Sequence, residues 1–305
     1  MAEVEGSQAA MSREPLPQLS TQQLEYLVAV ADADTWAEAA AALGVTPSAL
    51  SQGLSQLERR IGVPLFSRDG RRRVPHSGAG PVLSYARRVV GDTRDLARWA
   101  RAVSGGEAGQ LRVGMIDLAA VAHFGPTLQR FRREHPDVDL HLAVAPSGPL
   151  SEQLLAGELA VAVIVEPVLN RGQLALTPLL RDQLGLYAPE GAEAGSPASW
   201  GPWVTFPSNS HTRQLIGRKL SELGATFDVV AESHQPEVLR GMVVLGMGWT
   251  VLPVAQAETG PSPLRRAQPE PLISRQLVVA ERHGAAPDAV AQRLISRLID
   301  RAGRS

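Results

Sequence analysis

Apolar residues recur every three or four positions through the first hundred residues, which is the period of helices that pack on one face. A capping box of Ser20 and Gln23 precedes the first such stretch, and Thr35 with Glu38 repeats the arrangement before an alanine-rich second stretch. Gly44 follows that stretch at the position of a C-terminal glycine. The pattern therefore predicts two successive helices, the second one short.

A third helix is predicted over about residues 47–60, after a turn that leaves space for little more than the glycine. Thr46 can cap it, and Pro47 suits its first position. One stripe is apolar and consists of Leu50, Leu54, Leu57 and Ile61. The opposite face carries Ser48, Ser51, Gln52, Ser55 and Arg59. An ordinary surface helix could look the same, but a short helix, a glycine turn and a second helix make a helix-turn-helix, and uncharged hydrogen-bonding groups suit base edges in a major groove.

Charge strengthens this interpretation. The whole chain carries a net charge of −1, yet residues 59–104 hold eleven arginines against three aspartates, a local net charge of +8. Within this segment Gly70 should turn a hairpin, the wing of a winged helix-turn-helix. The arginines expected to contact phosphates there are Arg68, Arg71, Arg72 and Arg73. A merely solvated face is disfavoured, because clustered arginines repel one another and gain nothing locally.

Residues 24–80 resemble the signature of the bacterial LysR-type transcriptional regulators. The matching positions are Ala39, Ala40, Leu43, Ser48, Ala49, Leu50, Ser51, Leu57, Glu58, Gly62, Leu65, Phe66 and Arg68. The family usually has glutamine at Pro47, a basic residue near Ser55, and threonine-proline at Ser77 and Gly78. The resemblance implies a regulator that binds double-stranded DNA, and it allows RNA polymerase as a further partner. Because two departures lie on the expected DNA face, it implies no particular operator.

A long helix is predicted from Pro81 to about Ser104. Its heptad seam consists of Val82, Ala86, Val89, Thr93, Leu96, Ala100 and Val103. Gly91 should weaken the helix by roughly 1 kcal/mol relative to alanine. The pattern fits a coiled coil and a helix packed on its own domain equally well. The resemblance implies a homo-oligomer, a dimer or tetramer, joined through this helix.

Beyond a glycine-rich break at 104–110, strands and helices alternate, and the apolar strands of the first set, in the order β-α-β-α-β, predict a parallel sheet covered by helices. Two similar sets imply two lobes with a cleft, and the resemblance implies an effector domain of the periplasmic-binding-protein type. The predicted fold is α/β: an all-α winged helix-turn-helix, a long linker helix and a two-lobed α/β domain. The predicted boundaries are a disordered extension over 1–18, a DNA-binding domain over 19–77, a linker over 78–104 and an effector domain over 109–303. Lobe I spans about 109–166 and 275–303, and lobe II about 167–274.

Three loops should meet at the cleft, where helix N-termini favour anions. The predicted effector-binding residues are Asp117, Leu118, Ser147, Ser208, Asn209, Ser210, Thr212 and Arg213. Ser210 or Thr212 could also simply cap a helix. Asp117 opposes an anion, so it either caps a helix or receives an amine or hydroxyl group. We expect a small polar metabolite as the effector, and the cluster near Arg213 favours an acid.

Composition and missing motifs narrow the remaining classes. The chain has no cysteine, which excludes disulfides and thiolate metal sites. Neither G-x-S-x-G nor H-E-x-x-H occurs, and the histidines lack ligand spacing, so we expect no enzymatic activity, no metal and no cofactor. With no signal peptide and no apolar run long enough for a bilayer, a cytoplasmic protein without membrane contact is expected. The alternatives are a two-lobed solute receptor or small lyase, and an architectural DNA-binding protein without an effector.

Overall fold

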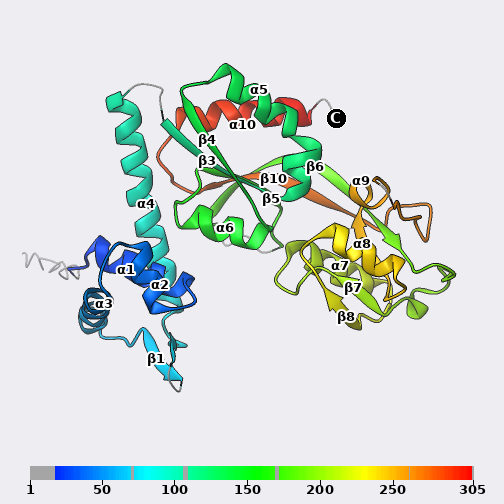
Figure 1. The fold of residues 1–305 in the computed structure, drawn as a ribbon, viewed down its shortest axis with the longest axis horizontal. Coiled ribbons are helices and arrows are strands. Elements are labelled where there is room, and N and C mark those ends of the chain that lie inside the picture. The colour runs from blue at the N-terminus through cyan, green and yellow to red at the C-terminus, as the bar shows by residue number, and fades with distance from the viewer. Residues whose placement is uncertain (1–17, 70–71, 106–108, 169–171, 261, 304–305) are drawn as a thin grey trace, which may run out of the picture. The chain divides into compact units, whose positions relative to one another are not determined.

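The chain folds into two compact units, which divide between Val90 and Gly91 (Figure 1). The computed structural model describes residues 18–69, 72–105, 109–168, 172–260 and 262–303. The predicted extension over 1–18 lies almost wholly outside these ranges. Within them, no helix combines the length and the hydrophobicity needed to cross a membrane.

The first unit is a three-helix domain with a β-hairpin. Its elements are α1 (Thr21–Asp32), α2 (Trp36–Ala42), α3 (Pro47–Ile61), β1 (Phe66–Asp69), β2 (Arg72–Pro75) and the first part of α4 (Gly80–Gly105). The predicted apolar stripes form its core, in which Leu24, Leu27, Leu50, Leu54, Leu57 and Leu65 are almost completely buried. The three predicted helices are therefore confirmed, and α4 begins one residue before Pro81.

Two of the three predicted helix starts have the expected caps. Thr35 and Glu38 form a complete capping box, and the Thr46 hydroxyl accepts the Ala49 N–H at 3.2 Å. The capping box predicted at Ser20 is wrong, because the Ser20 side chain makes no capping hydrogen bond. Gln23, its supposed partner, is instead buried and bonds Gln56 of α3. A side chain that finds a partner in another helix is lost to the cap of its own helix.

The second unit is built on a six-stranded sheet in the order β4-β3-β5-β10-β6-β9. The strands are β3 (Gly109–Met115), β4 (Val138–Val144), β5 (Val161–Val165), β6 (Leu174–Tyr187), β9 (Thr250–Pro253) and β10 (Ile273–Arg282). Parallel pairing holds for β4, β3 and β5, but β10 runs antiparallel to β5 and β6, and β6 runs antiparallel to β9. The parallel sheet predicted for the first three strands is therefore confirmed, and β10 joins it in the antiparallel sense because it returns from the second lobe in the opposite direction.

Helices cover both faces of this sheet, as Figure 1 shows. Helices α5 (Gly125–Glu134) and α10 (Ala289–Ala302) lie on one face, and α6 (Ser147–Leu155) lies on the other. A π-helical turn, Ala119–His123, precedes α5. The first lobe buries apolar residues of β3, β5 and β10 against these helices.

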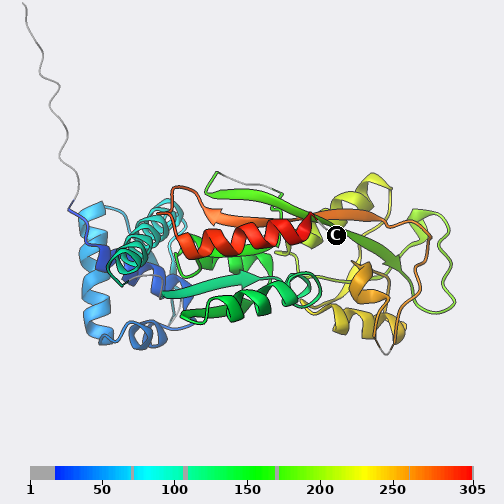
Figure 2. The ribbon, with the colours of Figure 1, turned by 90° about the horizontal axis from the view of Figure 1, so that it is seen from above.

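The second lobe has its own core, centred on Trp203, Trp249 and Tyr187. Its further elements are the parallel pair β7 (Trp203–Thr205) and β8 (Val229–Glu232), with α7 (His211–Glu222), α8 (Pro236–Val244), α9 (Val254–Ala257) and the 3-10 turn Pro197–Ser199. Figure 2 shows β6 and β10, green and orange, running side by side from the first lobe into the second. These two strands are continuous, so they connect the lobes as a paired ribbon.

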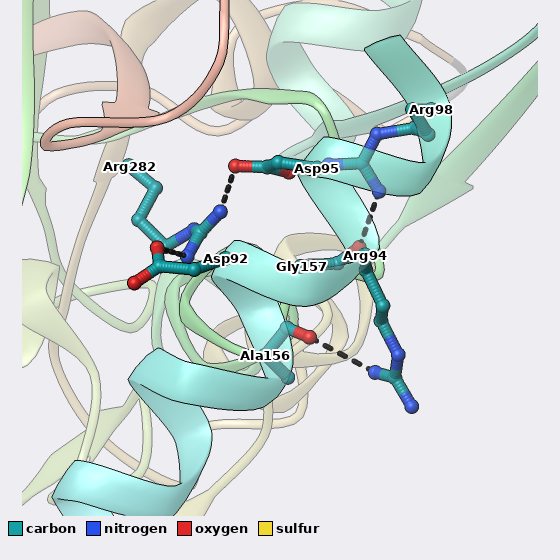
Figure 3. Close-up of polar contacts among 7 residues, drawn as sticks. All are labelled: Asp92, Arg94, Asp95, Arg98, Ala156, Gly157 and Arg282. Carbon is teal, nitrogen blue, oxygen red and sulfur yellow. Dashed lines mark hydrogen bonds and ion pairs between the residues drawn. The ribbon is translucent and has the colours of Figure 1, made fainter. Parts of the chain in front are cut away.

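The second half of α4 is held within the second unit through two glycines and two arginines (Figure 3). A Cβ atom on Gly91 would lie 2.8 Å from the Leu155 carbonyl oxygen, and one on Gly157 would lie 2.7 Å from the Gly91 Cα. Arg94 and Arg98 donate to the carbonyl oxygens of Ala156 and Gly157, at 2.9 and 2.6 Å. These carbonyls follow α6, so the two cations complete its negative C-terminal end.

A buried arginine completes this contact from the other side. The Arg282 guanidinium, from the end of β10, pairs with Asp92 at 2.5 Å and also with Asp95 of α4. Arg282 and Asp95 are each only 5% exposed. Buried charges of this kind need partners, so the two aspartates and the arginine fix where this half of α4 lies on the sheet.

The predicted seam of α4 is buried or partly buried in the first half of the helix and exposed in the described part of the second half. Ala86 and Val90 are buried in the core of the first unit, where Arg87 also pairs with Asp32 of α1. Farther along the predicted seam, Leu96 is exposed, as are Thr93 and Ala100. The side chain of Val103 lies outside the described part. The first half of the predicted seam therefore packs inside one chain, and the second half is exposed up to Ala100. Its role in a coiled coil stays a prediction.

We expect Gly91→Ala to destabilise the protein although alanine favours helices by about 1 kcal/mol. The added methyl group would collide with the backbone carbonyl of Leu155, which cannot move without shifting the end of α6. Gly241→Ala is the matched control, because Gly241 also lies inside a helix and a Cβ atom there meets nothing within 4 Å. Thermal unfolding followed by circular dichroism should show a lower Tm for the first variant and a higher Tm for the second. An equal rise in both would contradict the close contact.

Candidate nucleic-acid interface and effector cleft

The exposed face of α3 forms a shallow pocket. Its lining consists of Ser51, Gln52, Ser55, Gln56 and Arg59. Four of these were predicted from the sequence, and Gln56 was missed because nothing in the helical pattern distinguishes it from a solvated residue. Thr46, Pro47 and Ser48 are exposed at the start of the same helix. The pocket contains no acid, and hydroxyl, amide and guanidinium groups border it.

Contacts with α1 hold α3 in place, so that the polar face of α3 stays exposed. Gly53 allows the ring of Tyr26 to lie against α3, since a Cβ atom there would approach the ring to 2.7 Å. Arg60 lies near the end of α3 and donates to the Gln18 carbonyl oxygen at 2.8 Å. These contacts hold α3 against the start and the middle of α1 while its polar face stays open.

The hairpin after α3 is held at its base by one carboxylate. The Glu58 Oε1 accepts the backbone N–H groups of Leu65 at 2.8 Å and Phe66 at 3.3 Å. In the hairpin register Arg68 stands directly opposite Arg73, and Asp69 stands opposite Arg72. Gly70 and Arg71 lie outside the described residues, as do the side chains of the other predicted wing arginines.

The second candidate site is the predicted effector site, where the loops after β3, β4 and β5 lie. The loops that begin α6 and α7 approach each other there, since a Cβ atom on Gly148 would lie 3.9 Å from the Asn209 carbonyl oxygen. The buried Ser147 hydroxyl accepts the Val165 N–H at 3.1 Å. The Val165 carbonyl oxygen lies 3.1 Å from Nδ1 of His211, so one residue of β5 contacts both helix starts.

The two helix starts differ in how they are capped. The Ser210 hydroxyl accepts the Arg213 N–H at 3.5 Å, so Ser210 caps α7. Helix α6 begins after Pro146 and has no side-chain capping bond. Its first N–H groups, on Ser147 and Gly148, are the kind that bind a carboxylate or phosphate oxygen.

Asp117, in the loop after β3, bonds a residue of the second lobe. Nε2 of Gln256, on α9, donates to the Asp117 carboxylate at 3.0 Å. Oε1 of Gln256 is buried and has no hydrogen-bond partner within the described chain. Leu118 is buried in the first lobe. Sequence reasoning missed Gln256 because it is 139 residues from Asp117 and belongs to no motif.

Thr212 and Arg213 are occupied by contacts inside the protein. The buried Thr212 hydroxyl accepts from Arg275 at 2.9 Å, and Arg275 pairs with Asp182 at 2.8 Å. Arg213 donates to the Phe206 carbonyl oxygen at 2.8 Å and to the Glu232 carboxylate at 3.1 Å. Its guanidinium also lies 4.3 Å from the centre of the Phe227 ring. Ser208 and Asn209 are exposed in the loop that precedes α7.

One titratable group close after Asp117 in the chain has a shifted pKa. His123 ends the π-helical turn after Asp117, and burial lowers its pKa, so its ring is neutral near pH 7. No cluster of three or more histidine, aspartate or glutamate side chains that could hold a metal occurs among the described residues.

Comparison with known proteins matches both units. The model of the LysR substrate binding domain matches residues 104–303, and that of the lysR family of bacterial regulatory helix-turn-helix proteins matches residues 21–80. The transcriptional activator IlvY of Salmonella typhimurium is 27% identical over 256 residues, which is 79% of this chain and 85% of IlvY. The regulator EstR of Acinetobacter baylyi is 34% identical over 168 residues, 55% of each chain.

Solved structures agree on the fold. A full-length OxyR variant from Pseudomonas aeruginosa superposes with a TM-score of 0.60 at 22% identity, over 93% of this chain and 94% of that one. CbnR, a LysR family transcriptional regulator, superposes with a TM-score of 0.59 at 18% identity, over 93% and 99%. CbnR has also been solved with its target DNA, and that structure superposes with a TM-score of 0.54 at 18% identity, over 94% and 99%.

We expect Glu58→Ala to lower the stability of the first unit by about 1–3 kcal/mol, because it leaves two part-buried N–H groups without their acceptor. Glu58→Gln keeps an oxygen at the same place and should lose less. Thermal unfolding of the full chain, with both variants and the wild type side by side, measures the difference. If both variants lose the same stability, the carboxylate is not the anchor of the hairpin.

Proposed function

The chain belongs to the LysR family of DNA-binding transcriptional regulators, and from that premise we propose that α3 reads the operator and that an effector bound in the cleft controls the reading. Regulators of this family bind DNA and small-molecule effectors and form oligomers, and the family is not enzymatic. A solute receptor or a lyase would leave the helix-turn-helix unexplained. The observation that carries the proposal is the acid-free pocket on the exposed face of α3.

Two kinds of contact divide the work of DNA binding. We assign base contacts to the polar face of α3, including Ser48, Ser51, Gln52 and Ser55, because hydroxyl and amide groups can match base edges. Thr46, Pro47 and Arg59 flank this face and are assigned to the same interface. Phosphate contacts are assigned to the wing arginines Arg68, Arg71, Arg72 and Arg73. The facing positions of Arg68 and Arg73 support this, since a phosphate would relieve their repulsion.

The outer face of α4 is the surface on which we propose that two copies pair. Tyr85 and Leu96 are 42% and 58% exposed there, and Trp99, which borders a pocket shared with Arg282, is 46% exposed, so three large apolar groups on one helix are open to a partner. Tyr85 and Leu96 are eleven residues apart and Leu96 and Trp99 three, both helical spacings. A homodimer joined along α4 would carry two copies of α3 to half-sites about one helical turn apart, or a multiple of it. We propose RNA polymerase as the partner on which the bound regulator acts.

The cleft favours a small acid that also carries a hydrogen-bond donor. The uncapped start of α6 offers N–H groups to a carboxylate, with Ser147 and Asn209 beside it. Asp117 and the buried Oε1 of Gln256 offer acceptors to a hydroxyl or amine. The predicted role of Arg213 is weaker than the sequence suggested, because Glu232 and Phe227 already occupy its guanidinium. Ser208 remains a contact at the mouth.

Helix α6 connects this cleft with the linker helix. Its first residues line the cleft, and Arg94 and Arg98 of α4 hold the carbonyl oxygens at its other end. A ligand that moves α6 on closing the lobes would therefore move α4 as well. The ligand can shift this equilibrium only by its differential affinity for the two arrangements, commonly about 1–3 kcal/mol, so partial effects on DNA binding are expected.

Substitutions in the wing and in α3 should have different effects on DNA binding. Replacing Arg71, Arg72 and Arg73 by alanine should weaken binding to all sequences and flatten its salt dependence by roughly one log unit per lost phosphate contact. Gln52→Ala should cost about 1–3 kcal/mol on the operator and little on random DNA. Fluorescence anisotropy with both DNAs over a salt series measures this. Equal losses on both DNAs for Gln52→Ala would show that α3 does not read the sequence.

Two charge changes in the cleft should act in opposite directions on an acid. Asn209→Asp adds a negative charge beside the start of α6, and Asp117→Asn removes one while keeping an oxygen for Gln256. For an acid found by a thermal-shift screen of metabolites, the first should weaken binding and the second strengthen it, by about 1 kcal/mol each. Calorimetric titration and DNA footprinting check affinity and response. If every hit is a cation, the preference for an acid is wrong; if no hit changes the footprint, the sensing role is rejected.

A further inference from the structure

We propose that Gln56 is a further specificity-determining residue of α3 and that it presents the nitrogen end of its amide to the DNA, so that it selects guanine or thymine against cytosine. This inference rests on the proposed role of α3 as the reading helix. It concerns a residue that the sequence pattern did not single out, and it predicts which base chemistry that residue prefers.

Gln56 lies where a base edge could reach it. It follows Gln52 by four residues, so the two side chains are neighbours on one face of the helix. Gln56 is exposed, and with Gln52, Ser55 and Arg59 it lines the pocket on α3. Most exposed glutamines sample many rotamers. Because binding must fix one of these rotamers, a mobile side chain contributes less to affinity and to selectivity.

The amide of Gln56 is held by a buried neighbour. Gln23 of α1 is only 7% exposed, and its Nε2 donates to Oε1 of Gln56 at 3.0 Å. Nη1 of Arg60 donates to Oε1 of Gln23 at 3.3 Å and to the Gln18 carbonyl oxygen at 2.8 Å. A chain of hydrogen bonds thus runs from Arg60 through Gln23 to Gln56.

The arginine fixes the direction of this chain. A guanidinium has five N–H donors and no acceptor, so Gln23 must turn its oxygen toward Arg60 and its nitrogen toward Gln56. Gln56 must then accept through its oxygen. Its own nitrogen, with two N–H donors, is left for a partner outside the protein. Turning the amide of Gln56 over would set two donors face to face at Gln23.

Donor polarity decides which bases Gln56 can recognise. In the major groove guanine presents O6 and N7 and thymine presents O4, which are acceptors, while cytosine presents the N4 amino group, a donor. A free glutamine can meet the paired donor and acceptor of adenine with both ends of its amide, but the oxygen of Gln56 is held toward the buried Gln23, which leaves the nitrogen as the outward end. We therefore expect a preference for guanine or thymine over cytosine at one position of each half-site, of roughly 5- to 150-fold.

Two substitutions that reverse the polarity test the proposal. Gln56→Glu has the same shape but only acceptors, so it should favour cytosine. Gln23→Glu leaves Gln56 in place, and its carboxylate would accept from both Arg60 and Gln56, which turns the oxygen of Gln56 outward. Gln22→Glu, on the exposed face of α1, adds the same charge without touching the pocket and is the control.

Each full-length protein is used to select sites from a randomised double-stranded DNA pool, and the enriched motifs are compared. We expect the same motif from the wild type and Gln22→Glu, and a shift from guanine or thymine to cytosine at one position per half-site with Gln56→Glu and Gln23→Glu. Comparing motifs separates a change of preference from the general loss of affinity that an added negative charge causes.

The outcomes separate the two levels of the argument. If the wild type enriches no motif, the proposed function of α3 fails. If the wild type enriches a motif that Gln56→Glu and Gln56→Ala leave unchanged, α3 reads DNA without Gln56 and this inference alone is overturned. A Gln56→Ala variant that loses affinity equally on all sequences would assign Gln56 to a phosphate, which also overturns it. The melting temperature of Gln23→Glu shows whether this variant is folded. If it is unfolded, the motif selected by Gln56→Glu decides the question.

Discussion

The close contact between Gly91 of α4 and Gly157 after α6 is the constraint on which the arrangement of the second unit depends. Neither position has room for a methyl group, and Gly157 also has a positive φ of 70°. Only because the backbones approach this closely can Arg94 and Arg98 reach the carbonyl oxygens at the end of α6. The residue that should weaken the linker helix by its propensity is therefore the one that lets the helix bind the effector unit.

Buried ion pairs give these junctions a single arrangement. Arg282 joins the end of β10 to the buried Asp95, with the exposed Asp92 as a second partner, and Arg275 joins β10 to the buried Asp182 of β6. A buried pair of this kind adds little stability compared with apolar residues, but the loss of one partner leaves an uncompensated charge, at a cost of about 3–5 kcal/mol. Another register of α4 on the sheet, or of β10 on β6, would separate these charges. The free-energy cost of that separation exceeds the stability that the pairs add to the native register.

Local patterns in the sequence predicted most elements, and contacts between distant residues account for what they missed. The stripe of Leu50, Leu54 and Leu57 is enough to place α3, since helix period and burial coincide there. The first half of β6 was not expected, because Asp182 and Pro178 resemble a loop until Arg275 neutralises the one and a bulge at Leu277 accommodates the other. The same holds for Gln256. No periodicity in one segment reports a partner more than a hundred residues away.

In both units an arginine orients a neutral polar side chain, because a guanidinium can donate hydrogen bonds but cannot accept them. Arg60 can only donate, so it orients Gln23 and through it Gln56. Arg275 likewise donates to Thr212 and takes the lone pair that a ligand could otherwise use. In the proposed function, neutral side chains supply selectivity, while the arginines of the wing supply affinity that does not depend on sequence. A chain with a net charge of −1 can bind DNA because these two tasks belong to different residues.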